Sequence, residues 1–204
     1  AVVKIKTILK PEKNTELSGF YKAGDVYCTQ CESEGFRRIT PFLDRPDVMA
    51  SYTVNITSDN PQNDTLLSNG NLISSGQTKD GKFTSKWHDP HKKPAYLFAL
   101  VNGDLQYIED HYKTMSGRDV TLRIYTEKGE KERAQFALDR LKVSMEWDEK
   151  AYGREYDLDL FNVVVAKNFT FGAMENKSLN IFSPKYIFAA SETETDMDFF
   201  NVDR

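Results

Sequence analysis

The chain has 204 residues, a net charge of −4, 39% hydrophobic residues and 28% charged residues, values typical of an ordinary soluble globular protein with one large domain or two small ones. The acidic balance gives no basic surface for nucleic acid, and no apolar run approaches the roughly 20 residues that span a bilayer, so we expect no nucleic-acid partner and no membrane partner. Two cysteines, Cys28 and Cys31, are too few for a disulfide scaffold. Together with the lack of a signal-peptide core, they predict a cytoplasmic protein.

The first half of the chain alternates apolar and polar residues over short spans that turn residues separate, which predicts a β-rich region. The residues 20–25 are expected to form a turn, and the residues 59–64 a loop. Asn69-Gly70 lies between two short apolar runs and predicts a β-hairpin. The expected strands are residues 3–9, 26–29, 48–57, 66–68, 71–73, 82–87 and 95–101.

The second half begins after Asn102-Gly103-Asp104, where the pattern becomes mixed, and we expect a domain boundary there. A helix is predicted at 131–149 from apolar residues at helical spacing. These residues are Ala134, Ala137, Leu138, Leu141 and Met145. Ser191 and Glu194 form a capping-box pattern, which predicts a helix that starts at Ser191. Because the chain stops at Arg204, soon after this start, the sequence indicates a fragment. The expected strands of this half are residues 105–112, 120–125, 160–166 and 179–182.

The stretch 172–176 lies between the last two of these expected strands and reads Gly-Ala-Met-Glu-Asn. Gly172 and Ala173 have almost no side chain, so another chain can approach their backbone closely and pair by strand addition. The carboxylate of Glu175 would then lie beside the bound backbone and accept hydrogen bonds from a cation. A plain strand-loop-strand segment with one solvated glutamate accounts for the same residues.

This stretch, continued through 177–182, resembles the exopeptidase signature of the zinc aminopeptidases of the aminopeptidase N family (M1, gluzincin), bacterial type. The segment 29–38 resembles a second signature of that family. The resemblance covers the whole chain and implies a mixed α+β fold. Residues 1–104 would be part of an N-terminal all-β saddle or sandwich domain, and residues 105–204 the truncated start of a thermolysin-like α/β catalytic domain.

The resemblance also implies a substrate-binding site. Glu32 and Glu175 would clamp the α-ammonium of a peptide, helped by Gln30, because two carboxylates give an ammonium charge-assisted hydrogen bonds. A mid-chain amide would leave both carboxylates unpaired, which is costly. The two carboxylates would come from different domains and meet at their interface. In the remaining roles, the substrate backbone would pair with Gly172 and Ala173, the first side-chain pocket would be lined by Met174, and the loop would be fixed by Asn176. The implied partner is a peptide with a free N-terminus.

The catalytic part of the family's machinery is missing from the sequence. The family binds zinc through His-Glu-x-x-His on a helix, and no histidine follows His111. We therefore assign no catalytic residue and no metal ligand to this chain, place the zinc ligands of the parent enzyme outside it, and expect the chain alone to be inactive. His88 and His91 are separated by Pro90, which prevents a regular helix with both on one face. These two and His111 are interpreted as surface or strand-end residues. Ser178 departs from the family pattern, because bacterial relatives usually have glycine there.

Two alternatives belong to other functional classes. A non-catalytic peptide-binding module that ends at Arg204 would use the same edge strand and clamp without a metal. A redox protein would use the spacing Cys28-Thr29-Gln30-Cys31, although the following Glu32 to Gly35 is a poor helix opening. Half of a structural zinc site is a further interpretation of the cysteines, but no second cysteine pair completes it.

Overall fold

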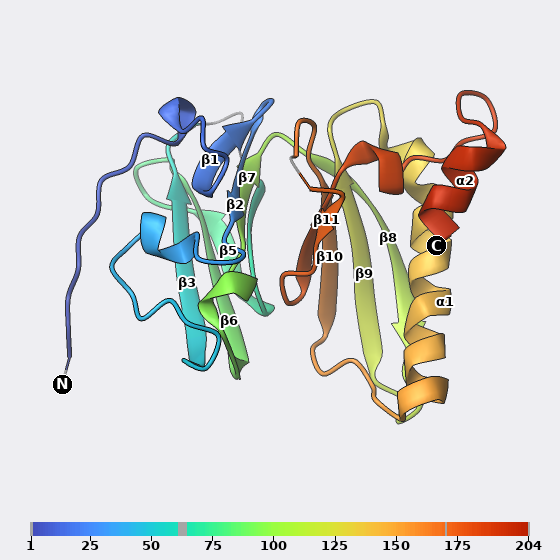
Figure 1. Ribbon diagram of the computed structural model, residues 1–204, viewed down its shortest axis with the longest axis horizontal. Coiled ribbons are helices and arrows are strands. Elements are labelled where there is room, and N and C mark those ends of the chain that lie inside the picture. Colours follow the sequence, from blue (N-terminus) through green and yellow to red (C-terminus); the bar gives the residue numbers. More distant parts are fainter. Residues whose placement is uncertain (1, 61–64, 170, 204) are drawn as a thin grey trace. The chain divides into compact units, whose positions relative to one another are not determined.

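The computed structural model describes residues 2–60, 65–169 and 171–203. It divides into two compact units (Figure 1). The first unit comprises Ala1–Asp104 and the short segment Glu175–Lys177, and the second comprises Leu105–Met174 and Ser178–Arg204. Each unit has its own sheet system and its own core. None of the helices in the described ranges is long and apolar enough to cross a membrane.

The described residues of the N-terminal unit form two antiparallel sheets and three short 3-10 helices. The four-stranded sheet has the order β1 (Gly19–Ala23), β2 (Val26–Gln30), β7 (Leu100–Gly103), β4 (Thr65–Ser68). The three-stranded sheet has the order β3 (Ala50–Ser58), β6 (Phe83–Lys93), β5 (Asn71–Gln77). The 3-10 helices are η1 (Pro11–Lys13), η2 (Phe36–Arg38) and η3 (Ala95–Leu97). Trp87 joins the two sheets, because its buried indole on β6 donates to the Leu66 carbonyl oxygen of β4 at 2.9 Å.

The predicted hairpin at Asn69-Gly70 is wrong. The chain does reverse there, but β4 pairs with β7 and β5 pairs with β6, so the turn carries the chain from one sheet to the other. Gly70 has a φ of +92°, and a Cβ at this position would lie 2.2 Å from the His88 carbonyl oxygen. The local turn signal was therefore correct, and long-range packing decided which strands pair.

Other differences in this unit have local causes. The residues 2–10 alternate like a strand but lie outside every sheet of the described chain and are mostly exposed. Most of the predicted turn at 20–25 belongs to β1, and only Gly24 and Asp25 form the turn. The predicted strand 95–101 is η3 followed by β7. Residues 59 and 60 of the predicted loop lie outside the strands, whereas 61–64 lie outside the described residues.

The strand β6 runs through Pro90, which the sequence placed beyond the strand end. Proline is tolerated because the pairing with β5 has ended at His88 and the pairing with β3 is irregular between Ala50 and Tyr52. The histidines flanking Pro90 therefore lie within a strand, with His88 half-buried and His91 exposed.

The second unit has one five-stranded mixed sheet with a long helix on one face (Figure 1). Its order is β11 (Ala173–Met174), β12 (Leu179–Phe182), β10 (Leu160–Val165), β9 (Asp119–Thr126), β8 (Gln106–Lys113). The strands β9, β10 and β12 are parallel, and the outer strands β8 and β11 are antiparallel to their neighbours. The helices are η4 (Lys131–Ala134), α1 (Gln135–Tyr152), η5 (Pro184–Tyr186) and α2 (Asp196–Asp203).

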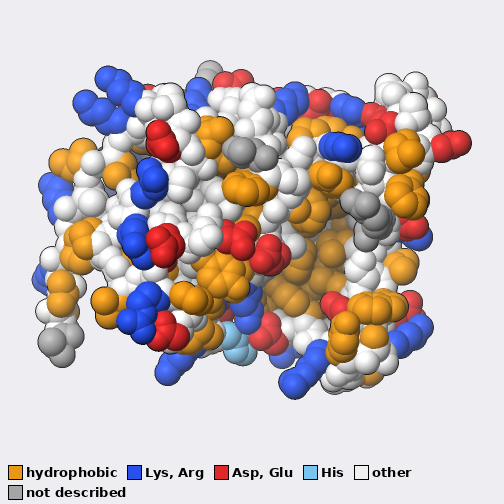
Figure 2. Space-filling model, in the orientation of Figure 1, with side chains coloured by type: hydrophobic (Ala, Val, Ile, Leu, Met, Phe, Trp, Pro, Cys, Tyr) orange, Lys and Arg blue, Asp and Glu red, His pale blue; other side chains and the backbone are white. Residues whose placement is uncertain are grey.

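The predicted helix face of α1 is confirmed, because Ala137, Leu138 and Met145 are buried in the core against β9 and β10. A hollow of this unit, where apolar side chains gather in Figure 2, is lined by residues that include Leu141 and Phe161. The fold class is thus the predicted one: a β-rich N-terminal unit followed by a mixed α/β sheet.

The start of the last helix is not where the sequence predicted it. Ser191 lies in a turn, and α2 begins at Asp196. The capping pair is one turn later, because the backbone N–H of Thr195 donates to Asp198 Oδ2 at 2.8 Å. Glu194 instead accepts a hydrogen bond from the Ala190 backbone at 2.9 Å and pairs with Arg133, a partner 61 residues away that sequence spacing does not reveal.

Candidate functional site

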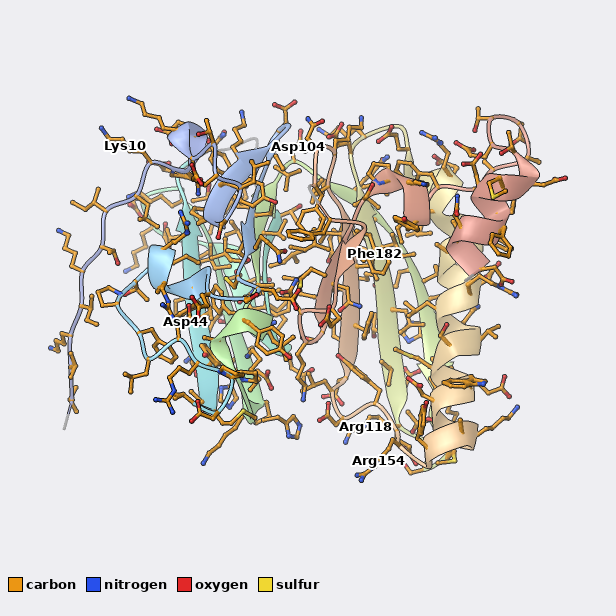
Figure 3. The ribbon with its side chains drawn as sticks, viewed as in Figure 1. Lys10, Asp44, Asp104, Arg118, Arg154 and Phe182 are labelled. Carbon is orange, nitrogen blue, oxygen red and sulfur yellow. The ribbon has the colours of Figure 1, made fainter. Side chains whose placement is uncertain are left out.

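The stretch 172–176 begins at the edge of the five-stranded sheet. The edge strand β11 pairs with β12 on one side only within the described residues, with Ala173 opposite Phe182 (labelled in Figure 3) and Met174 opposite Ile181. Gly172 and Ala173 are exposed, whereas Met174 is buried. The outer edge of β11 therefore presents the exposed backbone of Gly172 and Ala173, to which an extended peptide can add as a further strand.

Gly172 is required by its own surroundings as well. A Cβ at this position would lie 2.8 Å from Cε2 of Tyr186, so no larger residue fits without moving that ring. The Gly172 carbonyl oxygen accepts a hydrogen bond from the Ser183 backbone at 2.9 Å. Sequence reasoning assigned this glycine to the approach of a ligand and missed Tyr186, which fixes the backbone before any ligand binds.

The segment that follows β11 and carries Glu175 belongs to the N-terminal unit. The segment Glu175–Lys177 packs with the N-terminal unit, which also contains Gln30 and Glu32. Sequence reasoning assigned the two carboxylates to different domains, whereas the structure places both in one compact unit. Glu175 is exposed and Asn176 is buried.

Gln30 ends β2 with its side chain almost wholly buried, at 1% exposure. Neither Oε1 nor Nε2 of this amide has a hydrogen-bond partner in the described chain. A buried polar group in this state costs about 1–3 kcal/mol, and native structures contain few of them. The preceding Thr29 is equally buried, and its Oγ1 accepts a hydrogen bond from the Leu100 backbone at 3.0 Å, which fixes the end of β2.

A tight turn after β2 presents Glu32 to solvent. The Gly35 backbone N–H donates to the Cys31 carbonyl oxygen at 2.7 Å, and the Glu32–Ser33 peptide bond is cis. A Cβ on Gly35 would lie 2.4 Å from the Gln30 carbonyl oxygen. Only glycine therefore closes this turn, and the sequence signal for it was a glycine three residues after Glu32.

A buried cluster supports the turn from below. The ring of Phe36 packs edge-on against Phe98 and Tyr52, with centroids 5.1 and 6.2 Å apart. The Lys93 ammonium lies 4.0 Å from the Tyr52 ring centroid and 2.9 Å from Asp89 Oδ2. Burial lowers the pKa of Lys93, and the bond to Asp89 opposes that shift. The Lys93–Asp89 pair and the three aromatic rings thus pack beneath the turn that carries Glu32 and stabilise it.

The remaining part of the loop is tied down by Asp44, a buried carboxylate (labelled in Figure 3). It accepts a hydrogen bond from the Arg37 backbone at 2.9 Å, directly after the turn that carries Glu32. The guanidinium of Arg37 also donates to the Asp44 carbonyl oxygen at 2.8 Å. The segment from 31 to 44 is therefore closed on itself by bonds independent of any ligand.

The two cysteines do not have the character of a redox pair. Both are free and buried. Burial raises the pKa of the Cys28 thiol to about 12 and also raises the pKa of Cys31. Reactive thiols have the opposite shift, so the structure disfavours the redox alternative.

The histidines have ordinary partners. His88 Nδ1 lies 2.9 Å from Thr53 Oγ1, and His111 Nδ1 lies 3.0 Å from Asp119 Oδ2. Within the described ranges, no group of three or more His, Cys, Asp or Glu side chains is arranged to hold a metal ion. The part of the chain that the structure describes therefore offers no ligand set that fits a zinc ion.

Comparisons with known proteins give the chain its relatives. Residues 2–97 match the Peptidase M1 N-terminal domain, and residues 136–203 match the Peptidase family M1 domain. Aminopeptidase N of Escherichia coli (strain K12) is 48% identical over 202 residues, which cover 99% of this chain and 23% of that protein. Aminopeptidase N of Caulobacter vibrioides is 51% identical over 197 residues, covering 96% and 22%.

A solved structure shows the same fold. The crystal structure of Legionella pneumophila aminopeptidase A in complex with aspartic acid matches with a TM-score of 0.88 and 37% identity, over 93% of this chain and 22% of that one. The chain thus spans less than a quarter of the length of these relatives. By its two domain matches and these similarities, the chain belongs to peptidase family M1.

Proposed function

We propose that this chain is the part of a bacterial-type zinc aminopeptidase that recognises the free N-terminus of a peptide. The observation that carries the proposal is the buried amide of Gln30, which has no partner among the described residues and lies two residues before the exposed carboxylate of Glu32. Glu175, which is also exposed, belongs to the same unit.

The chemistry of an α-ammonium fits these three groups. An ammonium has three N–H donors and no acceptor. Glu32, Glu175 and the Oε1 of Gln30 supply three acceptors, two of them charged. Charge-assisted hydrogen bonds are about twice as strong as neutral ones. A mid-chain peptide has one N–H and no charge, so it would leave the carboxylates desolvated and unpaired, which is why the site would select chain ends.

The edge strand would hold the rest of the substrate. Gly172 and Ala173 are exposed on β11, where their backbone would pair with the substrate backbone. Met174 and Asn176 are both buried, at 1% and 0% exposure. Met174 would form a wall of the first side-chain pocket, and Asn176 would fix the loop that carries Glu175.

Hydrolysis would belong to the parent protein. Zinc, the family's cofactor, would supply an activated water there and would be held by residues outside this chain. We propose that the 204-residue chain alone hydrolyses nothing. Incubation with zinc and a chromogenic aminoacyl substrate tests this, and zinc-dependent release of an amino acid by the purified chain would contradict it. A cytoplasmic location is part of the same proposal and is supported by the two free thiols.

Recognition is tested by binding, without catalysis. We would titrate the chain with alanine amide and with N-acetyl-alanine amide, following backbone amide shifts by NMR. Binding of the first and not of the second is expected. Glu175→Gln and Glu32→Gln should each weaken binding by about tenfold or more, since one charge-assisted bond contributes about 1.5–3 kcal/mol. Glu16→Gln, an exposed carboxylate of the same unit, is the matched control. Equal binding of the acetylated compound would refute the proposal.

A further inference from the structure

Asn69 is a buried side chain to which neither signature assigns a role. It lies between β4 and β5 and is 1% exposed. Its Oδ1 accepts a hydrogen bond from the Ala99 backbone at 2.8 Å. Its Nδ2 donates to the carbonyl oxygens of Leu97 at 2.9 Å and Lys177 at 2.8 Å. Both N–H donors of the amide are therefore used.

The bond to Lys177 differs from the others in what it reaches. Leu97 and Ala99 are 28 and 30 residues from Asn69. Leu97 ends η3, and Ala99 directly precedes β7. Lys177 is 108 residues away and belongs to the three-residue segment that carries Glu175. A single buried amide thus joins this segment to the four-stranded sheet. A hydrogen bond that spans such a distance along the chain fixes a loop that local turn chemistry cannot fix.

The residue that follows Ala99 contacts the end of β2, which carries Gln30 of the proposed clamp. The residue after Ala99 is Leu100, whose backbone N–H donates to Thr29 Oγ1 at 3.0 Å. Thr29 directly precedes Gln30, which ends β2. The segment 97–100, from the end of η3 to the first residue of β7, therefore holds the Gln30 end of β2 through Leu100 and the Lys177 carbonyl through Asn69. Asn69 is the element of this path that contacts the loop.

We propose that Asn69 is a positioning residue, which sets where Glu175 lies by holding the Lys177 carbonyl against the segment 97–99 that leads into β7. This inference rests on the proposed function, because it assigns Asn69 a part in recognising the α-ammonium. Asn69 does not itself touch the substrate. Its effect on binding is expected to come from confining the loop, which lowers the ordering that a ligand must impose.

The decisive variant is Asn69→Asp. It keeps the shape of the side chain and the acceptor for Ala99, and it removes both donors. The matched control is Ser68→Ala, because Ser68 is equally buried and its Oγ donates to the Ala99 carbonyl oxygen at 2.8 Å. That bond holds the same Ala99 backbone but does not contact the segment that carries Glu175. Hydrogen–deuterium exchange of the peptide 172–182 and binding of alanine amide are measured on the full chain.

Asn69→Asp should raise exchange in 172–182 by about tenfold and weaken alanine amide binding by a similar factor, as the loss of a buried hydrogen bond implies. Ser68→Ala should change both by less than about twofold. Equal effects of the two variants, or loosened exchange with unchanged affinity, would overturn the positioning role. No binding of alanine amide by the unmodified chain would overturn the proposed function itself, which is a different outcome.

A measurement on the unmodified chain guards against a variant that does not fold. If the side-chain amide protons of Asn69 donate as the structure shows, they should exchange with solvent far more slowly than those of Asn55, which is exposed on β3. Exchange as fast as at Asn55 would remove the basis of the proposal.

Discussion

Gln30→Met is the substitution that separates stability from recognition most clearly. The amide of Gln30 is buried and has no hydrogen-bond partner in the ranges that the structure describes, a state that costs about 1–3 kcal/mol. Methionine has a similar length, adapts to irregular space and carries no amide. A swap of similar volume loses less than about 1.5 kcal/mol through imperfect packing. The net expectation is a free energy of unfolding that rises by about 1 kcal/mol.

Binding should move in the opposite direction. The variant lacks Oε1, one of the three acceptors proposed for the α-ammonium, so alanine amide should bind about tenfold more weakly. A residue that lowers stability and raises affinity shows the trade-off expected of a binding site. Both quantities come from one preparation, by urea unfolding and by titration.

Gln106→Met is the control for this pair of results. The Nε2 of Gln106 donates to the Glu127 carbonyl oxygen at 3.0 Å, so its loss should lower the free energy of unfolding by about 0.5–1.5 kcal/mol without affecting binding. The two glutamine substitutions are thus expected to change the free energy of unfolding in opposite directions. Destabilisation by Gln30→Met of the size seen at Gln106 would mean that the Gln30 amide is satisfied, and the reasoning would be refuted.

Three further substitutions test the backbone and the buried thiols. Ser178 has a φ of +61°, a backbone conformation that costs a non-glycine residue about 1–2 kcal/mol. Ser178→Gly should therefore raise the urea midpoint of unfolding. Asn168→Gly should raise it less, because Asn168 has the same φ of +61° and asparagine tolerates this region. Gly35→Ala should open the turn at Glu32, because the added Cβ would lie 2.4 Å from a backbone oxygen. Hydrogen exchange of the backbone amides in 31–35 should therefore rise. The control Gly76→Ala, at a site with open space, should leave the exchange of these amides unchanged. Since the folded state raises the pKa of Cys28 from 9.0 to about 12, its thiol contributes stability that is present below pH 9 and is lost between pH 9 and 12. Cys28→Ala should reduce that alkaline decline, which has a slope of up to about 1.4 kcal/mol per pH unit for one group, and an unchanged slope would contradict the shift.

Sequence patterns predicted the features that depend on the periodicity of a single element. The strand expected at 48–57 corresponds to β3, and the apolar face of α1 was predicted correctly because helical spacing decides which side chains are buried. The pairing of β4 and β5 was not, because Asn69-Gly70 has the residues of a hairpin turn and yet serves a crossover between sheets. Which strands pair depends on the whole set of available edges, and a four-residue window carries no information about them.

The candidate site divides in the same way. The residues that would touch a substrate lie in two short contiguous segments, which residue chemistry and the resemblance to a family signature both single out. The residues that hold them do not: Tyr186 fixes Gly172, Gly35 closes the turn at Glu32, and Asn69 reaches Lys177. Each acts through a contact that exists only after folding. The only local signal is a glycine or an asparagine, and both residue types are common in ordinary turns.

The proposed function separates recognition of a chain end from hydrolysis of its first bond, and the binding titration tests the first without the second. If the clamp binds a free amine without any metal, the selectivity for chain ends is a property of Glu32, Glu175 and their supports, and zinc adds only the reaction. The coding sequence after Arg204 then decides between the two classes of function. A His-Glu-x-x-His shortly downstream would place the clamp in a zinc exopeptidase, whereas a stop codon would leave a peptide-binding module with the same selectivity. Binding of alanine amide should be the same in both cases, which is why the binding experiment and the downstream sequence together, and neither alone, identify the function.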